Sequence, residues 1–373
     1  MNRRMLRAVL LLLLCMALTL SALAAQLPDV PSIYAAEKTQ LGLKERDTVL
    51  DQAALVPAGS SASDWLAMTL ARAGVPERYG AYLDTLRTYV EQQYAENGGL
   101  DRIRSTEWQR IALTVLALGG DPTQFGTGPD GAPIDLIADG TYGWQGENAP
   151  DLQGVNADIF ALLTLDAAGC EVPADARYPR SYFEQNLLAA QLPDGGFGLS
   201  AGGEMDVDMT AMAVQALAPQ QAQYAAQIEA ALAALSAAQL PDGTFASWDT
   251  PNAESTAQVV LALCCLGIDP ETDARFVKNG KTVLDGLSVF LLPEGVFTHA
   301  AENQPNLMAT EQAMRALTAL DRLRAGQSSY FAMADAAVTE PAPRRTVWPW
   351  AAGAAVLAAA ALAAVLLRKK PKS

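Results

Sequence analysis

The chain is poor in the residues that build metal centres and disulfide frameworks. Its 373 residues include one histidine, His299, and four cysteines. Cys15 lies in the N-terminal apolar run, and the other three include an adjacent pair, Cys264 and Cys265, inside an apolar segment. A zinc site of histidine and cysteine is therefore not expected, nor is any other metal or cofactor. The cysteines are interpreted as small buried hydrophobic residues, and no disulfide framework is predicted.

Alternating runs of β-branched residues are also scarce, which argues against a substantial β-sheet. Half of the residues are hydrophobic, although only 7% are aromatic. The apolar residues gather in six segments that are apolar on nearly every side, and a helix without a polar face is a buried helix. These segments cover residues 63–73, 105–118, 156–168, 208–217, 254–266 and 310–320.

Between the apolar segments lie stretches with an apolar stripe on one side and charged residues or glutamine on the other. Such one-sided stretches predict surface helices that cover the buried set. Buried and covering helices therefore alternate along the chain. The covering stretches are residues 78–96, 134–138, 178–190, 221–238 and 282–292.

A glycine-containing turn recurs where a covering helix gives way to a buried one. A helical repeat of about 50 residues predicts hairpins packed side by side, as a closed ring or an open superhelix. We expect an all-α domain over residues 60–325, with about six inner and six outer helices. The sixth outer helix comes from the lead-in, residues 26–59, or from residues 328–337. The turns are offset by 48 and 52 residues and read QLPDGGF at 191–197, QLPDGTF at 239–245 and LLPEGVF at 291–297.

The N-terminal residues 1–25 have the three parts of a secretory signal peptide. Arg3, Arg4 and Arg7 precede an apolar run, and small residues follow it. This pattern predicts cleavage near Ala24 and Ala25, with an uncleaved membrane anchor as the alternative.

The C-terminal part contains a second apolar segment. Residues 347–367 form an uncharged span of 21 residues, long enough to cross about 30 Å of hydrocarbon as a helix. Basic residues dominate the following tail, 368–373, and favour a cytoplasmic location for it. The sequence therefore predicts a single-pass protein of the cell membrane. Its body lies outside the cytoplasm, and residues 326–346 form a tether.

The body between these ends is strongly acidic. Nine of the 26 basic residues lie in the terminal pieces, which leaves 17 basic against 41 acidic residues, a formal charge of −24. Such a charge disfavours nucleic acid and anionic lipid headgroups as partners, and it favours solubility or cationic partners.

The turns and one helix start carry a family resemblance. QLPDGGF and QLPDGTF resemble the QxxxGxW repeat of squalene cyclases, and DVDMTA at residues 206–211 resembles their DxDDTA motif. The body is similar to the α/α toroid shared by terpenoid cyclases, protein prenyltransferase β subunits, complement-type thioester domains and the cobalamin-binding intrinsic factor family. The resemblance implies the same fold, an α/α toroid.

In squalene cyclases the middle aspartate of this motif protonates the substrate, which implies Asp208 as the acid here and Asp206 as its partner. The aspartate that follows it in the family is Met209 in this chain. As the expected cap of a helix beginning at Met209, Asp208 would have a lowered pKa, because backbone N–H groups favour the carboxylate. A general acid needs the opposite shift.

The other family activities find little support in the residues. Prenyltransferases hold zinc with Asp, Cys and His, and no cysteine lies near DVDMT. The GCGEQ motif of thioester domains is absent. Residues 252–270 resemble the intrinsic factor family, in which a further β domain closes over a corrinoid, but none follows the helical body here.

A ring of helix starts offers a binding site instead. Inner helices of a closed ring begin at the same end, so their first residues meet around one mouth. Capping of each helix by its own polar residue explains the same residue types. The mouth residues are expected to be Asn156, Asp158, Asp206, Asp208, Asn252, Glu254, Thr310 and Glu311, together with Ser105 and Asn306.

We therefore expect a membrane-anchored toroid that binds a small ligand, corrinoid-like or isoprenoid-like, or a cell-surface protein, without catalysis. The alternatives are a terpene cyclase that uses Asp208 as its acid and a structural cell-wall protein. A large apolar cavity with Asp208 facing it favours the cyclase, and a shallow polar mouth over a core packed with alanine favours binding.

Overall fold

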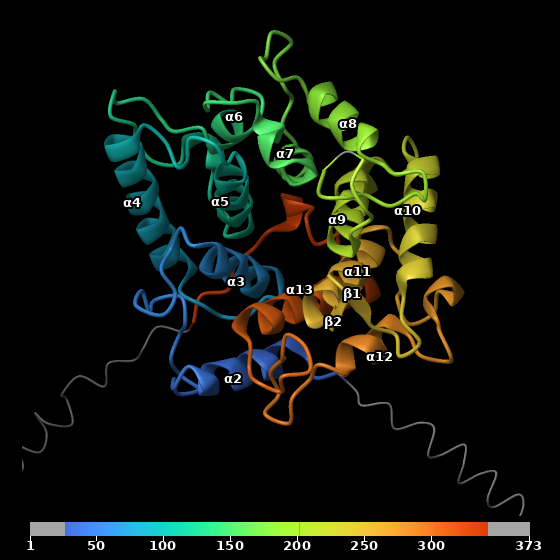
Figure 1. Ribbon diagram of the computed structural model, residues 1–373. Helices are drawn as coiled ribbons and strands as arrows, with labels where there is room; N and C mark the ends of the chain where they lie inside the picture. Colours follow the sequence, from blue (N-terminus) through green and yellow to red (C-terminus); the bar gives the residue numbers. More distant parts are fainter. Residues whose placement is uncertain (1–26, 201, 342–373) are drawn as a thin grey trace, which may run out of the picture. The chain divides into compact units, whose positions relative to one another are not determined.

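The computed structural model describes residues 27–200 and 202–341 (Figure 1). The predicted signal peptide, the membrane span and the tail lie outside these residues. Within them, no helix combines the length and the apolar character that crossing a membrane requires. The chain divides into two compact units, residues 1–339 and 340–373, and the helices and strands of the described residues belong to the first.

All six predicted inner helices are present, and they close into a ring. Each contacts the next, and the last returns to the first. Their buried faces carry alanine, leucine, methionine and valine, so the core lies inside and between these helices. The inner helices are α3 (Ser61–Arg72), α5 (Thr106–Ala117), α7 (Val155–Ala168), α9 (Val207–Leu217), α11 (Ala253–Cys265) and α13 (Leu307–Arg324).

The outer helices lie around this ring (Figure 1). Five match the covering stretches predicted from the sequence. The sixth, α2 (Val30–Gln40), begins at Asp29, whose side chain accepts a hydrogen bond from the Ser32 backbone, and packs on α13. The lead-in thus supplies the sixth outer helix. The other five are α4 (Tyr79–Asn97), α6 (Leu136–Gly140), α8 (Arg180–Ala189), α10 (Ala225–Ala238) and α12 (Val283–Ser288).

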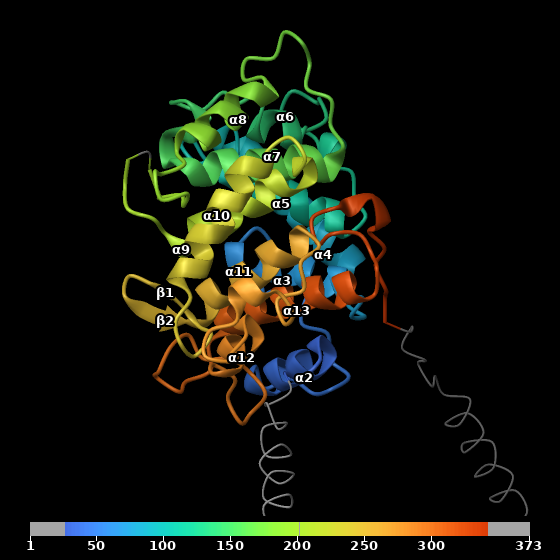
Figure 2. The same cartoon turned by 90° about the vertical axis from the view of Figure 1, so that its right-hand side faces the viewer.

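Residues 328–335 do not belong to an extended tether. Tyr330, Phe331 and Met333 are buried, and this segment contacts the inner helices α3, α7 and α13. Arg72 at the end of α3 donates to the Tyr330 carbonyl (3.0 Å) and to the Ser329 carbonyl (3.1 Å). Figure 2 shows this red segment on one side of the ring and the β1–β2 hairpin on the other. The prediction that residues 326–346 form a tether is wrong for residues 328–335, because apolar side chains hold these residues against the ring.

Regular β-structure among the described residues is confined to a small hairpin. Strands β1 (Phe245–Ser247) and β2 (Thr250–Asn252) pair antiparallel across a turn in which Trp248 and Asp249 have positive φ. The hairpin joins the turn QLPDGTF to the start of α11, so it lies at the end of the ring where the inner helices begin.

Each repeated turn is fastened to the inner helix that follows it. In every copy the turn phenylalanine is fully buried, and its backbone N–H donates to a threonine hydroxyl in the first turns of that helix. The shared geometry explains why the turn and the helix start recur together in the sequence. The pairs are Phe197 with Thr210 (2.9 Å), Phe245 with Thr256 (3.1 Å) and Phe297 with Thr310 (3.0 Å).

The turn glycine is required by the backbone. Gly195, Gly243 and Gly295 all have positive φ, between 84° and 93°. At Gly243 a Cβ atom would lie 2.1 Å from the Thr282 carbonyl oxygen of the next hairpin. Only glycine therefore allows this turn to approach its neighbour.

The turn glutamine links neighbouring hairpins. Gln191 donates to the carbonyls of Gly195 (2.9 Å) and Gln227 (2.8 Å). Gln239 repeats the arrangement with Gly243 (3.3 Å) and Phe276 (3.0 Å). Each side chain thus closes its own turn and binds the following hairpin, which gives the repeat glutamine a structural role.

We expect Gln239→Leu to lower the free energy of unfolding by about 1–3 kcal/mol, because two buried carbonyls lose their donor. Urea denaturation followed by circular dichroism measures the change. The control Gln221→Leu, on an exposed residue, should stay within about 0.5 kcal/mol of the parent protein. Equal stability of Gln239→Leu and the parent would contradict this structural role for the repeat.

Candidate functional site

The mouth of the ring is formed by the helix starts, and three of its polar residues are helix caps. Asp206 accepts from the Met209 N–H (2.9 Å), Asn252 from the Ser255 N–H (2.8 Å) and Asn306 from the Ala309 N–H (3.0 Å). The cap of α9 is therefore Asp206, and the expectation that Asp208 caps this helix is wrong.

Asp208 lies in the first turn of α9, half-buried. Its Oδ1 is buried and has no hydrogen-bond partner among the described residues. Burial raises the pKa of Asp208 to about 6, helped by the charges of Asp206 and Glu254 and opposed by the Ser255 hydroxyl. The expected lowering by the helix start is thus outweighed by desolvation. Asp208 has the direction of shift that a general acid requires.

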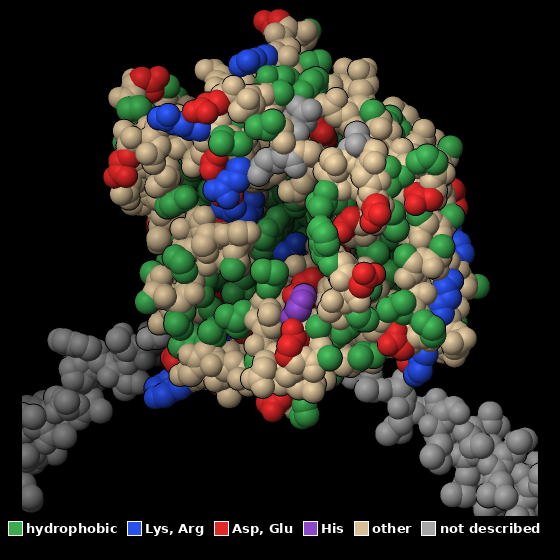
Figure 3. All heavy atoms as spheres, in the orientation of Figure 1, with side chains coloured by type: hydrophobic (Ala, Val, Ile, Leu, Met, Phe, Trp, Pro, Cys, Tyr) green, Lys and Arg blue, Asp and Glu red, His purple; other side chains and the backbone are tan. Residues whose placement is uncertain are grey.

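A glutamate–histidine pair lies beside Asp208 at the mouth. Glu254, largely buried in the first turn of α11, lies 2.8 Å from Nδ1 of His299, measured from its Oε2. The His299 side chain is 44% exposed. The purple histidine stands at the edge of the central hollow in Figure 3. The sequence pattern does not indicate this pair, because Glu254 lies 45 positions before His299.

The remaining predicted mouth residues do not share one role. Asp158 is buried and lies 3.4 Å from the Asn186 amide of α8, while Asn156 is half-buried in the first turn of α7. The Thr310 hydroxyl accepts a hydrogen bond from the Phe297 backbone of its turn. Glu311 lies deeper and accepts from Thr69 (2.7 Å) on the neighbouring helix α3. The residues predicted to form the mouth thus have different roles: some cap helices, some hold turns, and Glu311 lies in the interior.

A cavity of about 440 Å³ lies inside the mouth and is lined by side chains of α2, α3, α7, α9, α11 and α13. Phe160, Met212 and Gln258 line it, each four residues after one of the mouth residues Asn156, Asp208 and Glu254. Because residues four apart share a helix face, these mouth groups lie over its entrance. The lining is predominantly apolar and includes Leu41, Leu55, Val56, Trp65, Leu66, Leu307 and Met308.

Aromatic rings and one ion pair shape the interior. The rings of Trp65 and Phe160 pack together at a tilt of 43°, with centroids 5.6 Å apart. The Arg315 guanidinium lies 4.3 Å from the centre of the Trp65 ring and is bound by Glu311 at 2.6 Å. The cavity therefore offers aromatic faces to a hydrocarbon, with its one lining arginine already neutralised.

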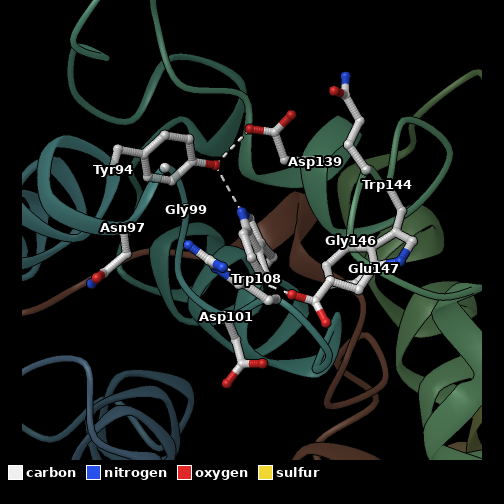
Figure 4. A pocket seen from close by; sticks show the side chains of 12 residues that line it. Tyr94, Asn97, Gly99, Asp101, Trp108, Asp139, Trp144, Gly146 and Glu147 are labelled. Atoms are coloured by element: carbon white, nitrogen blue, oxygen red, sulfur yellow. Dashed lines mark hydrogen bonds and ion pairs between the residues drawn. The ribbon is translucent and has the colours of Figure 1, made fainter.

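A second cavity, of about 420 Å³, lies outside the inner ring near α4, α5 and α6 (Figure 4). Its aromatic groups bond to one another. Trp108 donates to the Tyr94 hydroxyl (2.7 Å), and Tyr94 donates to Asp139 (2.5 Å). Trp108 also packs edge-on against Trp144. These contacts assign the aromatic groups to packing between hairpins.

In the part of the chain that the structure describes, no group of three or more His, Cys, Asp or Glu side chains is arranged to hold a metal ion.

Two sequence relatives of the chain are named as drimenyl diphosphate synthases. No family model matches the chain. A drimenyl diphosphate synthase of Streptantibioticus cattleyicolor is 31% identical over 248 residues, 60% of this chain and 45% of that protein. A drimenyl diphosphate synthase of Streptomyces showdoensis is 28% identical over 301 residues, 76% and 55%. The chain thus spans about half the length of these relatives.

Solved structures establish the fold. Candida albicans protein geranylgeranyltransferase-I, complexed with GGPP, aligns with a TM-score of 0.52 at 12% identity, over 80% of this chain and 92% of that one. An unsaturated glucuronyl hydrolase from Bacillus sp. GL1 aligns with 0.50 at 13%, over 82% and 98%. The chain therefore has the α/α-toroid fold that its turns predicted.

The expectation of ligand binding without catalysis is overturned by the sequence relatives, since both are named as synthases. That expectation rested on the predicted export, the predicted membrane anchor and the loss of an aspartate at Met209. The relatives support the cyclase alternative instead, which agrees with a largely apolar cavity whose lining residue Met212 follows Asp208 by one helical turn.

Proposed function

We propose that the chain is a terpene-cyclase-type enzyme that cyclises an isoprenoid by protonating a carbon–carbon double bond, with Asp208 as the acid. The observation that carries this proposal is the half-buried Asp208 carboxyl, whose buried Oδ1 has no hydrogen-bond partner among the described residues. It lies one helical turn before Met212, which lines a largely apolar cavity. A carboxyl group in such a place holds its proton to higher pH than one in water.

The reaction conserves mass. The Asp208 O–H bond breaks, and the proton forms a C–H bond with the electron pair of a double bond, which leaves a cation on the adjacent carbon. A second double bond attacks this cation and closes a ring. Loss of a proton from carbon ends the sequence with a new double bond. A diphosphate ester remains intact in this chemistry, which agrees with the product for which the relatives are named.

The cavity wall supports the cationic stage. The quadrupole of an aromatic ring attracts positive charge at its face, and Trp65 and Phe160 line the same space as Met212, one helical turn from Asp208. Asp206 and Glu254 add negative charge near the acid. Their charge stabilises the protonated state of Asp208 before the reaction and the cation after it.

The direct test is conversion of isoprenoids by the purified full chain in an uncharged detergent. The substrates are geranyl, farnesyl and geranylgeranyl diphosphate and squalene, each analysed for cyclic products of unchanged mass. Conversion of at least one substrate is expected. If all four are recovered unchanged while circular dichroism shows folded protein, the proposal is wrong.

We expect the single-turnover rate to fall as the pH rises through about 6, because Asp208 then loses the proton that it must donate. In Asp206→Asn the midpoint should move to lower pH, since the charge of Asp206 helps to raise the Asp208 pKa. Rapid-quench measurements between pH 4.5 and about 8.5 give both midpoints. A rate that rises with pH over this range would contradict Asp208 as the donor.

A further inference from the structure

One buried carboxyl group of the cavity takes no part in the chemistry above. Glu37 lies on α2, lines the central cavity and is only 2% exposed. Its Oε2 is buried and lacks a hydrogen-bond partner within the described residues. Leaving a buried carboxylate oxygen unpaired is costly, so native proteins rarely keep one without a use.

The charged neighbours of Glu37 do not neutralise it. Glu311 and Arg315 face the cavity from α13 and are bonded to each other by two hydrogen bonds, of 3.1 and 2.6 Å. Arg315 is thus already paired, and the charge of Glu311 disfavours a second carboxylate nearby. On α2 itself, the Tyr34 hydroxyl one turn earlier donates to Glu77 instead.

Among the described residues, the other elements around this part of the cavity contribute no charged lining residue. The lining residues of α3 are Ser61, Ala62, Ser63, Trp65 and Leu66, and the segment before α3 contributes Leu55 and Val56. A negative charge on Glu37 therefore lacks a counter-charge until something else enters the cavity. Burial and the Glu311 charge together raise the pKa of Glu37 to about 8, so this carboxyl is mostly protonated at neutral pH.

We propose that Glu37 is the anionic partner of a positively charged hydrocarbon ligand in the central cavity. The site combines one ionisable carboxyl with the aromatic faces of Trp65 and Phe160, the two kinds of group that attract an amphiphilic cation. In the proposed cyclisation, on which this reading of the site rests, the positive centre is the carbocation. A stable ammonium ion on an isoprenoid chain has the same charge and similar shape.

The site has a measurable signature, because the ligand must ionise Glu37. A permanent cation that binds beside Glu37 at pH 7 displaces its proton into the buffer. The ligand itself carries no dissociable proton, so each proton released comes from the protein. A neutral hydrocarbon of the same shape has no such effect.

Isothermal titration of the full chain with geranyltrimethylammonium, in an uncharged detergent at pH 7, tests the proposal. Titrations in phosphate and in Tris, which differ in ionisation enthalpy, give the number of protons released. We expect about one proton per bound cation, as follows from a carboxyl of raised pKa becoming charged. The carbon analogue, with a tert-butyl group in place of the trimethylammonium group, should bind without proton release.

Two variants and one control separate the explanations. In Glu37→Gln proton release should vanish and the cation should bind at least about 10-fold more weakly, a change of about 1.4 kcal/mol, while the neutral analogue binds as before. Glu37→Met, of similar length but apolar, should behave alike. Glu45→Gln, on an exposed residue of the segment after α2, should match the parent protein.

Failure of the cation to bind the parent protein, or unchanged proton release in both Glu37 variants, would overturn the proposal. This outcome is independent of the conversion assay. A chain that binds the cation through Glu37 but converts no isoprenoid would refute the cyclase function and keep the binding site.

Discussion

Asp208→Asn should lower the rate of isoprenoid cyclisation by at least about 100-fold, the smaller end of what a positioned general acid contributes. Asparagine has nearly the same shape, but its amide does not donate a proton to carbon. The measurement is product formation under single-turnover conditions, with cyclic products quantified by mass spectrometry. Binding of the substrate should change little, because the change removes a proton and leaves the cavity lining as it was.

The fold of this variant should be intact. The folded-state pKa of Asp208, about 6, lies above the ordinary value of 3.8. The native protein therefore binds this proton more tightly than the unfolded chain, and stability falls as pH rises from about 4 to 6. Asp208→Asn removes that loss, so at pH 7 its thermal midpoint should equal or exceed that of the parent.

Asp206→Asn is the matched control. Asparagine caps a helix as well as aspartate, so the hydrogen bond from Met209 is kept. We expect at most a modest loss of rate, through the lowered pKa of Asp208. Equal losses in Asp206→Asn and Asp208→Asn would mean that the helix start as a whole matters, and that Asp208 has no separate role as the acid.

The repeated turns and inner helices could be predicted because their signals are local. A helix that is apolar on all sides must be buried whatever surrounds it, and the turn motif contains its own glycine and phenylalanine. The sixth outer helix was left between two candidates. Its apolar face, with Ile33 and Tyr34, becomes informative only once α13 is known to lie beside it.

The site depended on contacts that a sequence does not contain. Glu37 faces Glu311, more than 270 positions later, and neither local pattern indicates a shared cavity. The sequence predicted a lowered pKa for Asp208 from the helix start alone. Desolvation reverses it, and desolvation depends on which helices pack around the mouth.

Met209 is less damaging to a catalytic role than the motif suggests. Its side chain is buried in the hydrophobic core, while Asp208 is half-buried. An aspartate at position 209 would be a second buried carboxyl beside Asp208. Asp206 and Glu254 already supply the negative charge that raises the Asp208 pKa. The chain thus retains an Asp208 carboxyl with a raised pKa, although the neighbouring aspartate of the motif is missing.

The largest change in stability is expected at the buried ion pair between α3 and α5. Asp64 is completely buried and accepts from Arg110 (3.0 Å), the Tyr82 hydroxyl (2.7 Å) and the Gly59 backbone (3.0 Å). Arg110 also donates to the Gly59 carbonyl (2.9 Å). The pair thus joins two inner helices to an outer helix and to the segment before α3.

Arg110→Ala should lower the free energy of unfolding by about 3–5 kcal/mol, because the Asp64 carboxylate stays buried without its counter-charge. Urea denaturation at pH 7 measures this loss. Arg104→Ala removes an exposed arginine paired with Asp101 and should cost less than about 1 kcal/mol. The double variant Asp64→Leu with Arg110→Met removes both charges and should recover part of the loss, since an apolar pair avoids the desolvation of an unpaired ion. If the double variant is less stable than Arg110→Ala, the hydrogen bonds of Asp64 to Tyr82 and Gly59 contribute more to the ring than the ion pair does.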